Sequence, residues 1–164
     1  MKRNGTFELL AKHGIRPSAQ RLAIAEYVLD TTAHPSAERV FDEVSARLPM
    51  LSRATVYNTL HLLVEKRLLR QLPIAEGTAV FDPQLDPHHH FVDDATGEIL
   101  DVPWEAIDVR RVEALRGFTV REYQVVLWGR SGPRCPAAGR ASPRRRPTAR
   151  AGRGRRTDTP GRPA

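Results

Sequence analysis

The chain has 164 residues, of which 40% are hydrophobic and one is cysteine. This length suffices for one domain, or two small ones, with a buried core. No apolar run approaches the roughly 20 residues of a membrane helix, and the first residues lack the apolar segment of a signal peptide. A single cysteine excludes an internal disulfide framework and a cysteine-rich zinc knuckle. We therefore expect a soluble, cytoplasmic protein.

Charge is distributed unevenly along the chain, which has 26 Lys and Arg residues against 19 Asp and Glu residues. Residues 1–74 carry a net charge of +4 and residues 75–130 carry −6, whereas residues 131–164 contain ten Arg and one acid. A basic first half favours contact with nucleic acid, and an acidic second half favours contact with cations.

Residues 131–164 contain none of Val, Ile, Leu, Met, Phe, Tyr and Trp, and 11 of these 34 residues are Gly or Pro. Such a segment cannot bury enough apolar surface to offset the entropy of ordering, so we expect a disordered tail outside the fold. Its arginines could attract DNA phosphates regardless of sequence. Alternatively, its composition suits an accidental C-terminus read out of frame from GC-rich coding sequence, and we favour this second interpretation.

The first half is typical of a compact helical unit followed by a hairpin. Helical spacing of apolar residues, with capping Ser and breaking Gly or Pro, predicts helices at residues 5–13, 18–30, 37–48 and 53–69. Two short strands are expected at 68–74 and 78–82 around a tight turn. This order is the outline of a winged helix-turn-helix, in which the last helix before the hairpin enters the major groove of DNA.

The expected helix at 53–69 has two different faces. Its apolar residues, Val56 and Leu60 among them, form one stripe that should be buried. Tyr57 and Asn58 lie on the opposite face and suit contacts with base edges and phosphates. The alternative is that Tyr57 is a half-buried packing residue.

Residues 83–87 contain two prolines and no periodic pattern, which indicates a hinge between two domains at residues 1–82 and 88–130. The second domain is expected to contain strands at 88–94 and 98–102, a helix at 103–115 and a long strand at 118–128. The last strand is apolar on both faces, which predicts that a second copy of the chain covers one of them. The predicted fold class is α+β: a winged helix joined by a hinge to a small α/β dimerisation domain.

Three consecutive histidines follow the hinge. Because side chains alternate along a strand, His88 and His90 leave the same face. Asp82 precedes the hinge, and Asp101 lies on the next expected strand. Two imidazoles with carboxylates suit a divalent metal such as Fe²⁺, Mn²⁺ or Zn²⁺. The alternative is a polar, solvated strand end without a metal.

Four segments, in this order, resemble the ferric uptake regulator (Fur) family of metal-dependent bacterial repressors. They are HPSAERVFDEV, LSRATVYNTLHLL, FDPQLDPHHHFV and TGEILDVP, and the resemblance extends from about residue 6 to residue 129. It implies a homodimer that binds double-stranded operator DNA through its winged helix. The residues expected to contact that DNA are Arg16, Arg53, Thr55, Tyr57 and Asn58.

The resemblance also implies a sensing-metal site that spans both domains. Its ligands would be His34, Asp82, His88, His90 and Asp101. Both acids are Asp, which is similar to the peroxide-sensing branch (PerR) of the family, whereas its iron sensors more often carry Glu. The VYNTL segment is similar to that branch and to the haem-linked iron response regulators (Irr). The metal would be Fe²⁺ or Mn²⁺, with Zn²⁺ as a substitute in vitro.

The chain departs from the family at a structural zinc site. Most members hold this zinc through two CxxC pairs, which would fall at Asp93 and Thr96 and near Ser131 and Arg134. None of these residues is Cys, and Cys135 alone cannot form a four-thiolate site. No structural zinc is therefore expected.

Together these patterns predict a metal-dependent transcriptional repressor that senses peroxide or iron, and not an enzyme. One alternative is a haem-responsive regulator of the same family, in which His89 and Asp108 form a haem site or second metal site; a solvent-facing His89 without a ligand is the simpler interpretation. An alternative of another class is a His/Asp metal-dependent hydrolase, because such a site can activate water. A third is a nucleic-acid-coating protein that acts through its Arg-rich tail.

Overall fold

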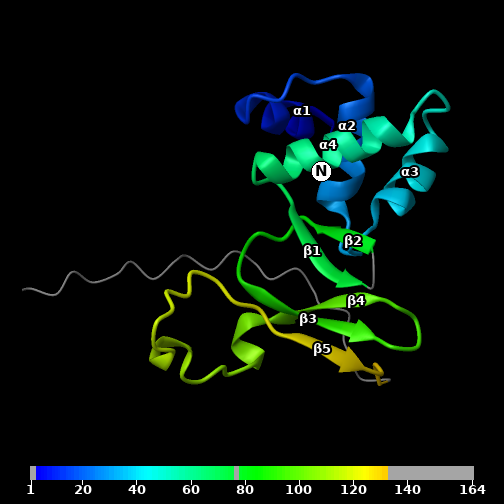
Figure 1. Ribbon diagram of the computed structural model, residues 1–164. Helices are drawn as coiled ribbons and strands as arrows, with labels where there is room; N and C mark the ends of the chain where they lie inside the picture. Colours follow the sequence, from blue (N-terminus) through cyan, green and yellow to red (C-terminus); the bar gives the residue numbers. More distant parts are fainter. Residues whose placement is uncertain (1–2, 76–77, 133–164) are drawn as a thin grey trace, which may run out of the picture.

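The computed structural model describes residues 3–75 and 78–132 (Figure 1). Its helices are α1 (Arg3–Lys12), α2 (Ala19–Asp30), α3 (Ala37–Ser45) and α4 (Arg53–Glu65). Its strands are β1 (Arg70–Ala75), β2 (Thr78–Asp82), β3 (His88–Asp93), β4 (Ile99–Pro103) and β5 (Val126–Gly129), and two short 3-10 helices are η1 (Trp104–Ala106) and η2 (Val112–Ala114). Figure 1 shows α1–α4 gathered above the β1–β2 hairpin, with the three-stranded sheet below it.

Serine side chains cap the N-termini of α2, α3 and α4. Ser18, Ser36 and Ser52 each accept a hydrogen bond from the backbone N–H three residues later, at 3.3, 3.2 and 3.1 Å. These caps confirm the predicted starts of α3 and α4, whereas α2 begins one residue later than predicted because Ser18 is its cap. The chain leaves α1 at Gly14, whose φ of +70° costs a glycine little.

The helical unit is built on one continuous apolar core. Val56, Leu60 and Leu63 of α4 are fully buried and pack with apolar residues of the other three helices. On the opposite face of α4, Tyr57 is 43% exposed and Asn58 is exposed as well. The two faces of α4 therefore lie as the apolar spacing predicts.

The β1–β2 hairpin is joined to the helices just before α3. The Phe81 N–H donates a hydrogen bond to the carbonyl of Pro35 at 3.0 Å, and Ser36 forms an isolated bridge with Val80. Phe81 is 1% exposed and belongs to the helical core. These contacts bring His34, which precedes Pro35, close to Asp82, which follows Phe81.

The second sheet has the strand order β4-β3-β5. β3 is antiparallel to β4, with His90 opposite Asp101, and parallel to β5, with His90 opposite Val126. Because side chains alternate along a strand, those of His88 and His90 leave one face of β3 and that of His89 leaves the other.

Two predictions for the second half are wrong. The segment 103–115 contains η1 and η2 instead of one continuous helix, and Arg111 between them has a φ of +66°. The strand expected at 118–128 is formed only over β5, Val126–Gly129. Leu115 and Phe118 are 53% and 76% exposed. A short helix is unstable when its apolar residues have no surface to cover, so the local pattern was not sufficient here.

Residues 76–77 of the expected hairpin turn, and residues 133–164 of the expected tail, lie outside the described residues. In the part of the chain that the structure describes, no helix is long and apolar enough to cross a membrane.

Candidate metal centre and nucleic-acid interface

Five ligand-type side chains converge where the helical unit meets the second sheet. They are His34 in the loop before α3, Asp82 at the end of β2, His88 and His90 on β3, and Asp101 on β4. One ligand atom from each of the first four lies within 4.8 Å of the others. Asp101 Oδ1 lies 2.9 Å from His34 Nε2 and 3.6 Å from His88 Nε2. The structure thus brings together all five residues for which the sequence predicts a metal site.

The cluster is shielded from solvent. The side chains of His34, Asp82, His88 and His90 are at most 2% exposed, and that of Asp101 is 20% exposed. His88 Nε2 lies 3.1 Å from Asp82 Oδ2 and 2.9 Å from His90 Nε2. Burial of this extent does not fit a solvated strand end, because buried charges require partners.

Burial and hydrogen bonding act in opposite directions on the ionisable groups of the cluster. For Asp82, burial disfavours the carboxylate, but the nearby imidazoles of His88 and His90 and a hydrogen bond from the backbone N–H of Gln84 hold its pKa well below the usual range. For His88, burial acts to lower the pKa, but the Asp82 carboxylate and the Asp86 carbonyl raise it above the ordinary value. The cluster therefore keeps a buried negative charge at Asp82.

Several buried atoms of the cluster have no partner with hydrogen-bond geometry among the described residues. They are both ring nitrogens of His34, Asp82 Oδ2, His90 Nδ1 and Asp101 Oδ1. Buried polar atoms normally have a partner, so these orphaned atoms suit ligands of a cation. Three imidazoles and two carboxylates fit a divalent ion such as Fe²⁺, Mn²⁺ or Zn²⁺.

His89 leaves the opposite face of β3 and is fully buried, so the expectation of a solvent-facing side chain is wrong. Its ring stacks on Trp104 at a centroid distance of 4.6 Å, and its Nδ1 accepts a hydrogen bond from the Val125 N–H at 3.1 Å. Burial and the two neighbouring histidines lower its pKa. Asp108 is exposed and pairs with Arg110. Among the described residues, the converging ligand group includes neither His89 nor Asp108.

The residues predicted to contact DNA lie near the start of α4 and in the loop before α2. The side chain of Arg53 is 55% exposed, and Tyr57 and Asn58 are exposed on the same helix. Thr55 is half-buried, and its hydroxyl is hydrogen-bonded to that of the N-cap serine at 2.9 Å. Arg16 is exposed in the loop before α2.

A second polar cluster, which the sequence reasoning missed, lies at the turn after β3. The Asp93 carboxylate accepts hydrogen bonds from the backbone of Ala95 (2.8 Å), Thr96 (3.3 Å) and Ser131 (2.9 Å), and from the Ser131 hydroxyl. The bonds from Ser131 and Ala95 lower the pKa of Asp93 to about 2. Asp93 and Ser131 thus join the turn to the end of β5, at or near two positions where the resemblance implies zinc-binding Cys.

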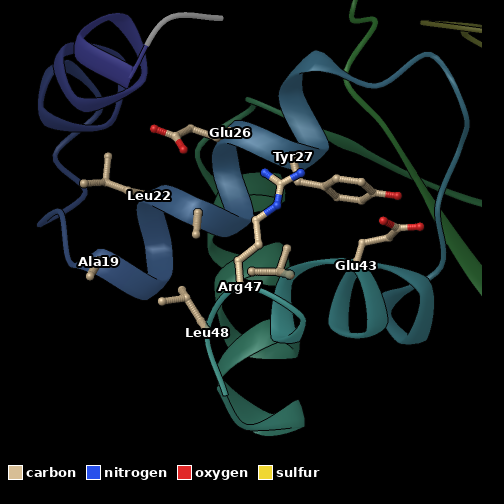
Figure 2. Close-up of a pocket in the computed structure, with 9 residues that line it drawn as sticks. Ala19, Leu22, Glu26, Tyr27, Glu43, Arg47 and Leu48 are labelled. Carbon is tan, nitrogen blue, oxygen red and sulfur yellow. The ribbon is translucent and has the colours of Figure 1, made fainter. Parts of the chain in front are cut away.

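A groove of about 300 Å³ lies between α2 and α3 (Figure 2). Glu26 and Tyr27 of α2 line one wall, and Glu43 of α3 and Arg47 after it line the other. No residue of the metal cluster and no predicted DNA contact lines this groove.

A winged helix joined through a buried His/Asp cluster to a small α/β unit defines a class of metal-dependent DNA-binding regulators. The sequence model of the ferric uptake regulator family matches residues 12–128, and the chain belongs to this family. It is 32% identical over 124 residues to the peroxide operon regulator of Bacillus subtilis (strain 168), a match that covers 74% of this chain and 86% of that protein.

Solved structures agree with this family. The ferric uptake regulator from Pseudomonas aeruginosa with manganese has a TM-score of 0.61 at 27% identity, over 80% of this chain and 98% of that chain. The ferric uptake regulator of Vibrio cholerae has a TM-score of 0.64 at 24% identity, over 76% and 98% of the two chains, which shows the shared fold. Membership in this family makes the chain a transcriptional regulator and not an enzyme, so the hydrolase alternative is not favoured.

Proposed function

We propose that the chain is a homodimeric, peroxide-sensing repressor that binds operator DNA when the His/Asp cluster holds Fe²⁺ or Mn²⁺. One observation carries this proposal: His34 and Asp82 precede the hinge, whereas His88, His90 and Asp101 follow it, and all five converge. The similarity to a peroxide operon regulator supports the signal, and the similarity to a regulator solved with manganese supports a divalent metal.

The cluster can couple metal binding to DNA binding through the arrangement of the two domains. When the five side chains share one ion, the loop before α3 is tied to β3 and β4. In a dimer this tie sets the separation of the two α4 helices, and DNA half-sites are matched only at particular separations. Metal occupancy then raises operator affinity by favouring one domain arrangement.

Bound Fe²⁺ would supply redox reactivity toward peroxide, next to the imidazoles of His34, His88 and His90. Oxidation of one of these rings would remove a ligand and weaken the connection between the domains.

The proposed division of the chain is a DNA-binding domain at residues 1–82, a hinge at 83–87 and a dimerisation domain at 88–130. A regulator of this kind acts on DNA in the cytoplasm.

We infer that α4 lies in the major groove of the operator. Arg53, Tyr57 and Asn58 are exposed near the start of this helix, where a recognition helix presents side chains to base edges. Arg16 and Thr55 are the remaining predicted contacts.

Substitution of His34 tests whether the cluster couples the domains. His34→Ala leaves four ligand-type side chains, so the variant should still bind Mn²⁺, but more weakly. It should lose most of the Mn²⁺-induced gain in operator affinity, because a metal that does not distinguish two arrangements cannot shift their populations. Mn²⁺ titration by calorimetry, together with fluorescence anisotropy of operator binding, measures both quantities.

His13→Ala is the matched control, since His13 directly follows α1, away from the cluster, and is hydrogen-bonded to the Leu9 carbonyl. This control should keep the wild-type response to Mn²⁺. If His34→Ala responded to Mn²⁺ as the wild type does, the coupling mechanism would be wrong, although the DNA-binding assignment would stand.

Peroxide treatment tests the signal. Anaerobically purified protein should contain Fe²⁺ or Mn²⁺ by elemental analysis. The Fe²⁺-loaded protein should lose operator affinity after peroxide, whereas the Mn²⁺-loaded protein should keep it, since only the iron form supplies the redox reactivity. Equal responses of the two forms would overturn the peroxide assignment, and a Soret band in the purified protein would favour the haem-responsive alternative.

A further inference from the structure

Glu38, an exposed residue in the first turn of α3, contacts two side chains on the DNA-facing surface of α4. One carboxylate oxygen, Oε2, forms an ion pair with Arg53, and the other, Oε1, accepts a hydrogen bond from the Tyr57 hydroxyl at 3.4 Å. A single carboxylate from a neighbouring helix therefore bridges two of the residues proposed to contact DNA.

Arg53 is held on a second side as well. Its guanidinium lies 4.4 Å from the centre of the Phe41 ring, in a cation–π contact with α3. The guanidinium is thus positioned by one aromatic face and one carboxylate, both from α3. This arrangement limits the rotamers of a long side chain before DNA arrives, which lowers the entropy cost of binding.

Stability does not explain this network. The side chains of Arg53 and Glu38 are 55% and 51% exposed, and ion pairs at such sites contribute little to the free energy of folding. An acid on a surface that faces phosphates also repels them. The carboxylate is therefore placed to affect DNA binding more than folding.

That effect differs between random DNA and an operator. Random DNA attracts the protein mainly through phosphates, and Arg53 with its charge cancelled by Glu38 gains little from them. An operator also offers base edges to Tyr57 and Arg53, which Glu38 holds in place. Weakening the wrong complex more than the correct one is a recognised route to specificity.

We propose that Glu38 is a positioning residue that sets DNA selectivity: it orients Arg53 and Tyr57 and suppresses binding to random DNA by neutralising Arg53. This inference rests on the proposed function, since it takes α4 as the recognition helix. Glu38 is not among the DNA contacts that the resemblance to the Fur family implies, so the inference adds a residue to that surface.

The test compares Glu38→Gln, which keeps the shape but removes the charge, with Glu43→Gln. Glu43 is an exposed acid on the same helix that lines the α2–α3 groove, so the control removes the same charge from α3. The full Mn²⁺-loaded chain is titrated with two probes across a range of salt concentrations. One probe is a duplex that the wild-type protein selects from a randomised pool, and the other is a scrambled duplex of the same composition.

Glu38→Gln should bind the scrambled duplex roughly three- to tenfold more tightly. The logarithm of its affinity should also fall more steeply with the logarithm of the salt concentration, by about the amount expected for one more phosphate contact. Its affinity for the selected duplex should change by less than about twofold, so the selectivity ratio falls. Glu43→Gln should match the wild type in both affinities and in the salt slope.

A double-mutant cycle with Arg53→Ala shows whether Glu38 acts through Arg53. In the Arg53→Ala background, Glu38→Gln should leave binding to the scrambled duplex almost unchanged. The proposal is overturned if Glu38→Gln still tightens binding to the scrambled duplex without Arg53, or if Glu43→Gln tightens it equally. Either result would show that the acids of α3 simply repel DNA phosphates. If the pool yields no selected duplex, the proposed function fails, while the cycle on the scrambled duplex still decides the role of Glu38.

Discussion

Tyr57 is 43% exposed on α4, and its hydroxyl is the polar group that can reach a base edge. Tyr57→Ala should weaken specific DNA binding by about 1–3 kcal/mol if the side chain reads a base. The fold should persist, because the core face of α4 is unchanged. Anisotropy titrations with the selected and scrambled duplexes, together with a thermal melt, measure these effects. Equal losses on both duplexes would assign Tyr57 to phosphate contact.

Asp93 should make stability depend on pH in the acid range. Its folded-state pKa of about 2 is below the ordinary value of 3.8, so its carboxylate stabilises the fold fully above pH 3.8 and progressively less as the pH falls toward 2. Asp93→Asn removes this contribution. The loss in unfolding free energy should therefore be constant near neutral pH and shrink below pH 3.8, as measured by urea unfolding.

Asp94→Asn is the control for this series, because Asp94 is the exposed neighbour of Asp93. It should change the free energy of unfolding little, because surface substitutions away from special contacts usually have small effects. A loss in Asp93→Asn that stayed constant down to pH 2 would show that hydrogen-bond geometry, and not the charge of the carboxylate, stabilises the turn.

At the scale of single residues, the metal cluster could be predicted only in part from local pattern. Strand alternation places His88 and His90 on one face, which β3 confirms. His34 lies 48 residues before Asp82, and only the resemblance to a family joined the two. The Asp93–Ser131 contact spans 38 residues, and no local pattern signals such a pair. The Glu38 bridge from α3 to α4 likewise depends on packing between helices.

At the scale of elements, Ser52 determines where α4 begins. Its hydroxyl accepts the Thr55 N–H at 3.1 Å, which satisfies one of the unpaired donors in the first turn. Ser52→Ala should lower the free energy of unfolding by about 1 kcal/mol. Chemical denaturation measures the change. Ser52→Asp retains an acceptor and should recover most of the stability, whereas an equal loss in both variants would contradict the capping role.

The elements that sequence pattern predicted well are those with caps and a continuous core. α2, α3 and α4 each begin after a capping Ser, and their apolar faces meet inside one chain. The segment 103–125 lacks that support. β3 and β5 run parallel, with His90 opposite Val126. Because β3 begins only two residues before His90, residues well before Val126 extend past the start of β3 and have no neighbouring strand. Local propensity could not reveal this missing partner.

At the scale of the whole molecule, β5 leaves apolar surface uncovered. Leu127 and Trp128 are 40% and 60% exposed in the single chain, which supports the expectation that a second copy covers one face of this strand. Because no zinc is expected to stabilise this unit, a chelator should leave the dimer intact while it abolishes tight operator binding. Sedimentation with and without EDTA measures the first effect. Chelator-driven dissociation to monomers would contradict it.

The hydrogen bonds between Asp93 and Ser131 affect how well the protein resists oxidation. Thiolates are oxidised by peroxide, whereas a carboxylate and a hydroxyl are inert to it. The turn after β3 is therefore joined to β5 by groups that an oxidant cannot consume. If the histidine cluster reacts with peroxide, this contact should therefore remain in place. A protein built in this way would keep the contact between the turn and β5 after its sensor has been oxidised.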